Sequence, residues 1–133
     1  TFARRVYLDV IGRIPTYKEL MDFKNNPSQN KRDELIDNLI DSQGYVSHNF
    51  NYWADTLRIS HHVSTTMVKN YIEFIKDSFR KNKPYDQFVR ELLTAQGDAN
   101  KPGNGSTSYC TRDEGMPIDN LSNTMKIFLG TSM

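Results

Sequence analysis

Apolar residues recur three and four positions apart along most of the chain, and this spacing predicts a succession of helices. The first helix begins at Phe2, repeats its apolar positions every four residues and ends at Gly12. A capping box formed by Thr16 and Glu19 predicts a second, short helix that ends before Pro27. No stretch keeps the alternation of apolar and polar residues that a strand requires, so the pattern predicts an all-α protein.

The middle of the chain continues the pattern with four helices. The third helix is expected to begin at a cap at Ser28 and end near Asp41, and the fourth to run from about Tyr45 to Ile59. The fifth is expected to begin at a cap at Thr65 or Thr66 and end at Lys81–Pro84, and the sixth to begin at a cap at Asp86 and end at Gly97. The fourth helix holds Trp53, the only tryptophan, with Phe50 and Leu57 at helical spacing on either side. We therefore expect Trp53 to be the hub of the core.

Residues 98–115 differ in composition, being rich in Gly, Asn, Ser and Thr. We predict a long, exposed loop here that is mobile unless something binds it. A last helix begins near Pro117 and ends at Gly130. Its apolar face is expected to consist of Ile118, Leu121, Met125, Phe128 and Leu129. Residues 1–133 are thus expected to form a single compact bundle of about seven short-to-medium helices.

Length and charge limit the classes of function. A chain of 133 residues fits one domain with a core of its own. Seventeen basic residues against 16 acidic ones argue against a nucleic-acid binder, which usually carries a basic excess on one face. No apolar run is long enough to cross a membrane. The chain opens directly on an amphipathic segment without an initiator Met, so we expect a fragment of a larger protein.

Two groups of residues around the fourth helix are candidates for chemistry. Asp55 and Arg58 lie one turn apart, which favours a salt bridge that fixes the helix, with a carboxylate held at the rim of a site as the alternative. His61 and His62 are adjacent, and two neighbouring histidines in a loop can share a metal ion. No Asp, Glu or Cys stands beside them at ligand spacing, so solvated or capping histidines are the favoured interpretation.

Cys110 is the only cysteine, which excludes an internal disulfide and a cysteine-rich metal site. The positive charge of the neighbouring Arg112 favours a reactive thiol, but no histidine lies nearby in sequence to form a Cys–His pair. The chain also lacks a phosphate-binding glycine loop and a nucleophile elbow. An enzyme remains the alternative: a hydrolase with a site near residues 98–115 and His61/His62, where Asp113 and Glu114 offer two carboxylates.

Several segments resemble, in order and over nearly the whole chain, a bacterial domain family of unknown function that is abundant in planctomycetes. The two most specific segments are the opening Arg4-Arg5-Val6-Tyr7-Leu8-Asp9 with Gly12-Arg13-Ile14-Pro15-Thr16, and Asn82-Lys83-Pro84-Tyr85-Asp86-Gln87-Phe88-Val89-Arg90-Glu91-Leu92-Leu93. Trp53-Ala54-Asp55, Asn123-Thr124 and Phe128-Leu129-Gly130 also match the family's pattern.

The resemblance implies a place in large exported or periplasmic proteins, often beside cytochrome c-like domains. Members typically carry a Cys-x-x-Cys-His haem-attachment segment just after the part that matches Phe128-Leu129-Gly130. The present sequence stops at Met133 without that segment, so we expect no cofactor in this fragment, while haem c is possible in the parent protein. The leading hypothesis is a non-catalytic helical module whose partners are neighbouring domains that handle redox chemistry or carbohydrate.

Overall fold

The computed structural model describes residues 2–59, 64–111 and 116–131, and all regular structure within these ranges is helical. This confirms the all-α class. Eight α-helices lie in the described ranges, and the helix beyond the predicted seven falls inside residues 98–115. The chain divides into two units, Thr1–Asn51 and Tyr52–Met133, which are described separately below. The expectation of a single domain stays a prediction.

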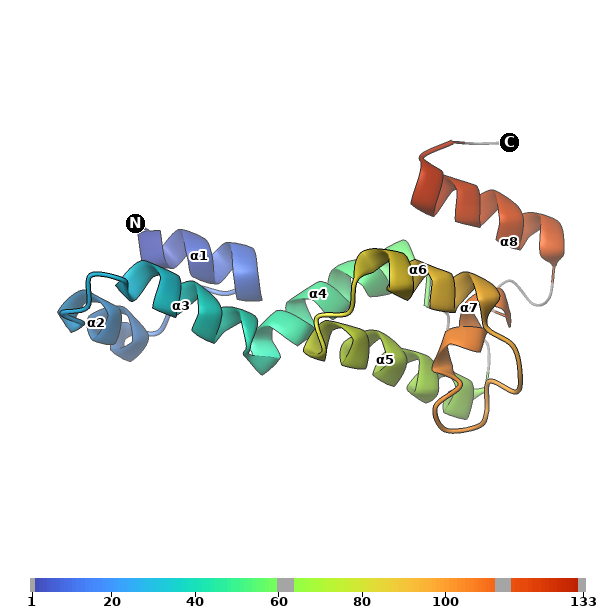
Figure 1. Ribbon diagram of the computed structural model, residues 1–133, viewed down its shortest axis with the longest axis horizontal. Helices are drawn as coiled ribbons and strands as arrows, with labels where there is room; N and C mark the ends of the chain where they lie inside the picture. Colours follow the sequence, from blue (N-terminus) through green and yellow to red (C-terminus); the bar gives the residue numbers. More distant parts are fainter. Residues whose placement is uncertain (1, 60–63, 112–115, 132–133) are drawn as a thin grey trace. The chain divides into compact units, whose positions relative to one another are not determined.

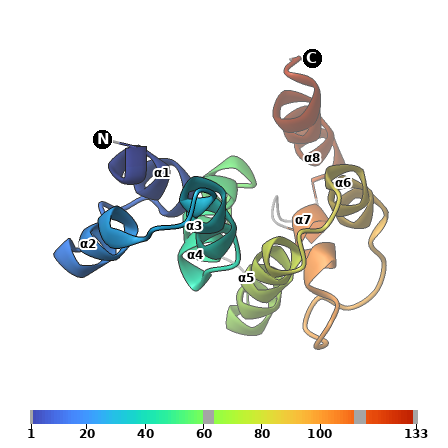
Figure 2. The same cartoon turned by 60° about the vertical axis from the view of Figure 1, so that its left-hand side comes forward.

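The first unit consists of α1 (Phe2–Ile11), α2 (Tyr17–Asn25), α3 (Lys31–Ile40) and the first part of α4 (Gln43–Thr56). Helix α1 packs along α3, as the blue and cyan helices of Figures 1 and 2 show. Gly12 ends α1 with φ of +71°, a left-handed conformation that suits glycine. A Cβ atom at Gly12 would lie 2.4 Å from Nδ1 of His48, so the chain also needs glycine here to pass the imidazole ring.

The start of α2 confirms the predicted capping box. The hydroxyl of Thr16 accepts from the backbone N–H of Glu19, and the Glu19 carboxylate accepts from the backbone N–H of Thr16. The predicted cap of α3 is wrong: Asn30 is the N-cap residue. Ser28 instead donates to Oε1 of Glu34 over 2.6 Å and so ties the preceding turn to the first turn of the helix.

The limits of α4 also differ from the prediction. The helix begins at Gln43, so Gly44 lies inside it, and it ends at Thr56 rather than near Ile59. A Cβ atom at Gly44 would lie 3.1 Å from Cβ of Ile11, so close packing against α1, which the sequence does not show, accounts for glycine inside the helix.

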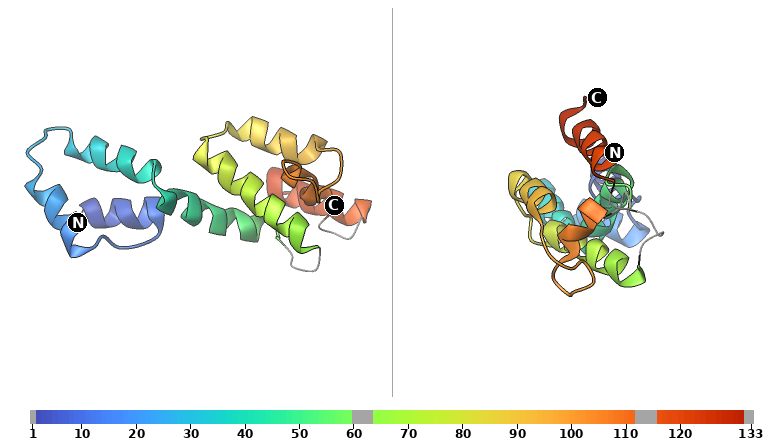
Figure 3. Two further views of the ribbon diagram at one scale, coloured as in Figure 1. Left: turned by 90° about the horizontal axis from the view of Figure 1, so that it is seen from below. Right: turned by 90° about the vertical axis from the view of Figure 1, so that its right-hand side faces the viewer.

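The second unit contains the rest of α4, α5 (Thr65–Arg80), α6 (Tyr85–Thr94), the 3₁₀ turn η1 (Gly105–Thr107), α7 (Ser108–Thr111), α8 (Pro117–Thr124) and the π-helical segment η2 (Met125–Leu129). Helices α5 and α6 run side by side, and α7 packs against both (Figures 2 and 3). The prediction that Asp86 caps α6 is wrong, because Pro84 occupies the N-cap position and Asp86 lies in the first turn. The helix ends at Thr94, before the predicted Gly97.

Trp53 lies at the centre of an aromatic cluster in the second unit. Its ring is 5.4–6.5 Å, centroid to centroid, from four other rings, which are those of Tyr52, Phe79, Tyr85 and Phe88. The predicted hub therefore exists, although Trp53 is itself only half-buried. The side chains with least exposure in this unit are those of Leu57, Ile75, Leu92 and Tyr109.

The prediction of an exposed loop is wrong for residues 105–111, which form η1 and α7, whereas residues 98–104 form turns that are mostly exposed. Asn70 of α5 donates to the backbone oxygens of Ala99 (2.9 Å) and Lys101 (3.2 Å). Ala99 and Tyr109 are almost completely buried. Gly105 lies directly against α5, where a Cβ atom would stand 2.1 Å from the backbone oxygen of Asn70. The glycines and small polar residues that suggested a loop allow this close approach of two backbones instead.

Candidate functional site

Arg58 ends α4 in a left-handed conformation, with φ of 53°. Its backbone N–H donates to the oxygen of Asp55 and that of Ile59 donates to the oxygen of Ala54, which is the hydrogen-bond pattern of a Schellman cap. A non-glycine residue in this conformation costs about 1 kcal/mol or more. The guanidinium of Arg58 donates to Oδ1 of Asn123 on α8 over 2.9 Å. The strained position thus carries a side chain that links the end of α4 to α8.

Helix α8 presents a polar face, formed by Asn120, Asn123 and Thr124, to the rest of the second unit. Asn120 donates to the backbone oxygen of Tyr109 over 3.1 Å. The Thr124 hydroxyl donates to the backbone oxygen of Asn120 and lies 2.8 Å from the hydroxyl of Tyr109. Because the single hydroxyl proton of Thr124 is used within the helix, Tyr109 donates in that contact. Polar contacts therefore anchor α8 on the buried α7.

The opposite side of α8 and η2 exposes large apolar side chains. Ile118 is 77% exposed, Leu121 51% and Leu129 68%, and no residue of α8 is buried. We call these three residues the apolar face of α8. Of the five residues of the predicted apolar stripe, Met125 and Phe128 are partly buried and these three are exposed. Amide and hydroxyl side chains anchor the helix, and the ring of Phe128 in η2 lies 6.0 Å from that of Tyr109, centroid to centroid. Ile118, Leu121 and Leu129 stay exposed in the described part of the chain.

A cavity of about 500 Å³ opens beside the apolar face of α8. Cys110 stands in its wall, exposed, with its thiol 3.8 Å from the backbone oxygen of Leu92. The cavity is lined mainly by apolar groups, together with two side chains of the polar face: Leu93, Cys110, Met116, Pro117, Asn120, Leu121 and Thr124. Leu93 of α6 is 45% exposed and belongs to this cavity wall. The arrangement suits an apolar group that enters from outside.

The other candidates from the sequence do not assemble around this cavity. Asp55 is exposed and forms no ion pair with Arg58 in the part of the chain that the structure describes. His61 and His62 lie outside the described residues. The same is true of Arg112, Asp113 and Glu114. Arg58 and Cys110 both lie beside α8, where Arg58 donates to Asn123 and Cys110 lines the cavity next to Asn120. A catalytic role for any of these residues stays a prediction.

Metal and haem chemistry find no matching donor set in the described ranges. No group of three or more His, Cys, Asp or Glu side chains there is close enough to hold a metal ion. Covalent haem attachment needs two cysteines and an adjacent histidine, and Cys110 is the only cysteine in the chain. The residues of this chain therefore do not fit a c-type haem.

A second cavity, of about 550 Å³, lies within the first unit between α1, α2 and α3. At its wall the guanidinium of Arg13 forms two hydrogen bonds of 2.7 and 2.9 Å with the Glu19 carboxylate. The hydrogen bonds from Arg13 and Thr16 lower the pKa of Glu19 to about 2. Burial, followed by the nearby Glu19 charge, raises the pKa of Tyr7. Since these groups bind one another, the network supports the fold of the first unit rather than marking a reactive group.

None of the described helices is long and apolar enough to span a lipid bilayer.

Comparison with known proteins gives a match to one family over the full length. No curated protein and no solved structure matches the chain. Residues 1–133 match the family PSCyt2, described as "Protein of unknown function (DUF1549)". The match spans both units and includes the capping box, the aromatic cluster and α8. The chain therefore belongs to the PSCyt2 family of proteins of unknown function.

Proposed function

We propose that this chain is a non-catalytic helical module of a larger exported protein, and that it docks a neighbouring domain through the apolar face of α8. The exported setting and the association with cytochrome c-like domains are supported by the family resemblance of the sequence. The docking role is supported by the structure of α8. The neighbouring domain is expected to handle redox chemistry or carbohydrate.

The observation that carries this proposal is the combination of a fixed helix with an uncovered apolar side. Ile118 and Leu129 are more than two-thirds exposed, and Leu121 about half. Burying one such side chain against a partner contributes about 1.5–3 kcal/mol. Meanwhile Arg58 and Tyr109 hold the opposite side of the helix. A partner would therefore meet a surface that is already ordered, which lowers the entropic cost of binding.

The cavity beside Cys110 extends the same surface. Met116 is 52% exposed and Leu93 45%, and both line the cavity together with Leu121. An apolar side chain of the neighbouring domain fits such a depression as an anchor residue. The exposed helix and the cavity thus form one continuous docking surface.

The hydrolase alternative has less support. Arg58 already donates to Asn123, and Cys110 stands in a mainly apolar wall without a described histidine near it. Neither of the carboxylates Asp113 and Glu114 lies in a described range. Among the described residues, no acid and base are joined in the way that general acid–base catalysis requires.

The test is binding of the neighbouring domain of the parent protein, produced separately, to this chain by isothermal titration calorimetry. We expect binding that weakens at least about tenfold when Ile118→Asp and Leu121→Asp are combined, because two apolar anchors are lost. The control is Ile14→Asp, a residue of the first unit that is 57% exposed and should leave binding unchanged. Equal affinity of the double variant and the unmodified chain would contradict the proposal, as would no binding at all.

The redox part has its own measurement. The longer parent protein should show Soret absorbance if a c-type haem follows this chain. Absence of that absorbance would remove the redox assignment but leave the docking role to the binding assay.

A further inference from the structure

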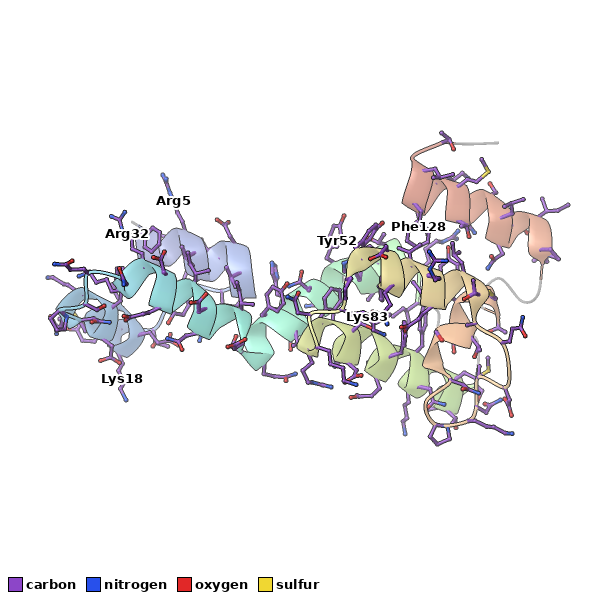
Figure 4. The ribbon with its side chains drawn as sticks, in the orientation of Figure 1. Arg5, Lys18, Arg32, Tyr52, Lys83 and Phe128 are labelled. Atoms are coloured by element: carbon purple, nitrogen blue, oxygen red, sulfur yellow. The ribbon has the colours of Figure 1, made fainter. Side chains whose placement is uncertain are left out.

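An open aromatic surface lies where the end of α4 meets the start of α6. Tyr52 is 66% exposed and Tyr85 58%, although aromatic side chains of this size are usually buried. Both rings lie beside the half-buried indole of Trp53, at centroid distances of 5.9 and 6.1 Å. We call Tyr52, Trp53 and Tyr85 the aromatic ledge. Figure 4 labels Tyr52 on α4 and Lys83 at the turn that leads into α6.

A second layer of rings holds the aromatic ledge in place from within. Phe88 lies 5.4 Å from Trp53 in an edge-to-face arrangement, and it stacks on Phe74 at 5.8 Å. Lys83 closes the turn before Tyr85: its ammonium lies 4.7 Å from the centre of the Phe74 ring and forms an ion pair with Glu91. Because Phe88 packs against the indole of Trp53, the exposed part of that indole is held in a fixed position. Little conformational entropy is then lost when a ligand stacks there.

An exposed carboxylate accompanies the rings. Asp55 follows Tyr52 by three residues on α4, so the two side chains share one face of the helix. Asp55 is exposed and takes part in no ion pair among the described residues. The site thus combines apolar ring faces, the hydroxyl groups of two tyrosines and a carboxylate that can accept hydrogen bonds from a hydroxyl-rich ligand.

These features select among possible ligands. A nucleic acid would bring phosphates towards Asp55, and the chain as a whole carries a net charge of only +1. Aromatic rings bind a quaternary ammonium group strongly only when they enclose and desolvate it, whereas exposed rings bind it weakly. Tyr52 and Tyr85 are too open to enclose a cation. A sugar ring differs from both, because it has an apolar C–H face for stacking and hydroxyl groups at its edge for a carboxylate.

We propose that the aromatic ledge binds a polysaccharide chain, with pyranose rings stacked on Tyr52 and Tyr85 against Trp53 and a sugar hydroxyl donating to Asp55. The site lies apart from the apolar face of α8, and the proposal does not depend on docking of a neighbouring domain. Each single contact is weak, and several sugar rings along one polymer raise the affinity through repeated engagement.

The experiment is titration of this chain with cellohexaose, xylohexaose, chitohexaose and, separately, choline, with intrinsic fluorescence as the signal. Trp53 is the only tryptophan, so the indole emission reports on the ledge itself. At least one of these saccharides should shift or quench the emission in a saturable manner. Tyr52→Ala and Tyr85→Ala should each weaken binding about five- to tenfold, since each removes one stacking surface.

The matched control is Tyr17→Ala, which removes a tyrosine that is 79% exposed in the first unit and should leave saccharide binding unchanged. Since Tyr52 and Tyr85 are themselves exposed, their removal should preserve the helical circular dichroism. Three results would overturn the proposal: no response to any of the saccharides, equal binding by the two ledge variants and the unmodified chain, or a response to choline alone. The last result would assign the ledge to a cationic ligand.

Discussion

Replacing Gly105 by alanine should separate residues 98–111 from α5. The added Cβ atom would stand 2.1 Å from the backbone oxygen of Asn70 and 2.8 Å from Cβ of Phe74. The first of these atoms belongs to the backbone of α5 and cannot turn aside as the end of a flexible side chain can. Gly105 does not adopt a positive φ, so the penalty is steric and not conformational. The segment itself must therefore move.

The magnitude follows from what that movement disrupts. Asn70 donates to Ala99 and Lys101, and each of these hydrogen bonds contributes about 1 kcal/mol. Overpacking at a close contact costs about 1–3 kcal/mol. We therefore expect Gly105→Ala to lower the free energy of unfolding by about 3 kcal/mol. Gly103→Ala is the matched control, because Gly103 has φ of +87° and open space around it, which leaves only a conformational cost of about 1 kcal/mol.

Urea unfolding followed by far-ultraviolet circular dichroism measures both free energies, and hydrogen exchange locates the effect. In Gly105→Ala, the backbone amides of residues 98–111 should exchange faster, whereas those of the first unit should keep their protection. A loss of stability in Gly105→Ala no larger than that in Gly103→Ala would refute the packing argument. Unchanged protection of residues 98–111 would refute it as well.

Substitutions at two further positions test single contacts. Arg58→Gly and Arg58→Ala both remove the hydrogen bond to Asn123, but only the glycine variant relieves the strain of the left-handed backbone conformation. Urea unfolding should therefore show Arg58→Gly to be about 1 kcal/mol more stable than Arg58→Ala. Equal stabilities of the two variants would contradict a strained cap. The pKa of Glu19 falls from 4.5 to about 2 on folding, so ionisation of this carboxylate contributes at most about 3 kcal/mol to the free energy of unfolding. Because Arg13 is half exposed and solvent weakens the ion pair, we expect a contribution of about 1–2 kcal/mol. Glu19→Gln should therefore be less stable than the unmodified chain above pH 4.5, and this difference should disappear as pH falls towards 2, where the carboxylate is protonated in both states; a difference independent of pH would contradict the ion pair.

Capping residues in the sequence correctly predicted the start of a helix only where a side chain forms its hydrogen bond with the backbone of the same turn. Thr16 and Glu19 satisfy each other across three residues, so the start of α2 is encoded within a single turn. Ser28 has the composition of a cap, yet its hydroxyl bonds to Glu34 on the following helix. Both choices are open to a serine, and only the path of the chain between α2 and α3 decides between them.

The wrong prediction for residues 105–111 has a different physical origin. Glycine and small polar residues predict a loop when nothing is known of neighbours, because they disfavour regular structure. Here Gly105 contacts the backbone of α5, and Asn70, about 30 residues earlier in the chain, provides the hydrogen bonds. A contact between segments so far apart leaves no periodic pattern in the sequence. Tyr109 is the one residue of the segment whose size and apolar ring could have indicated burial.

The last helix shows why an apolar stripe predicts amphipathicity but not burial. Ile118, Leu121 and Leu129 have the spacing of a core-facing stripe, and that spacing is the same whether the covering surface lies in the same chain or in another. What distinguishes the two cases is the other side of the helix. Asn120 and Thr124 form hydrogen bonds with Tyr109, and Phe128 lies beside its ring, so this side of the last helix takes the position next to the chain's own core. Ile118, Leu121 and Leu129 are left exposed. Amide and hydroxyl groups at the inner side of the helix, paired with a buried tyrosine, are therefore the feature that leaves Ile118, Leu121 and Leu129 exposed.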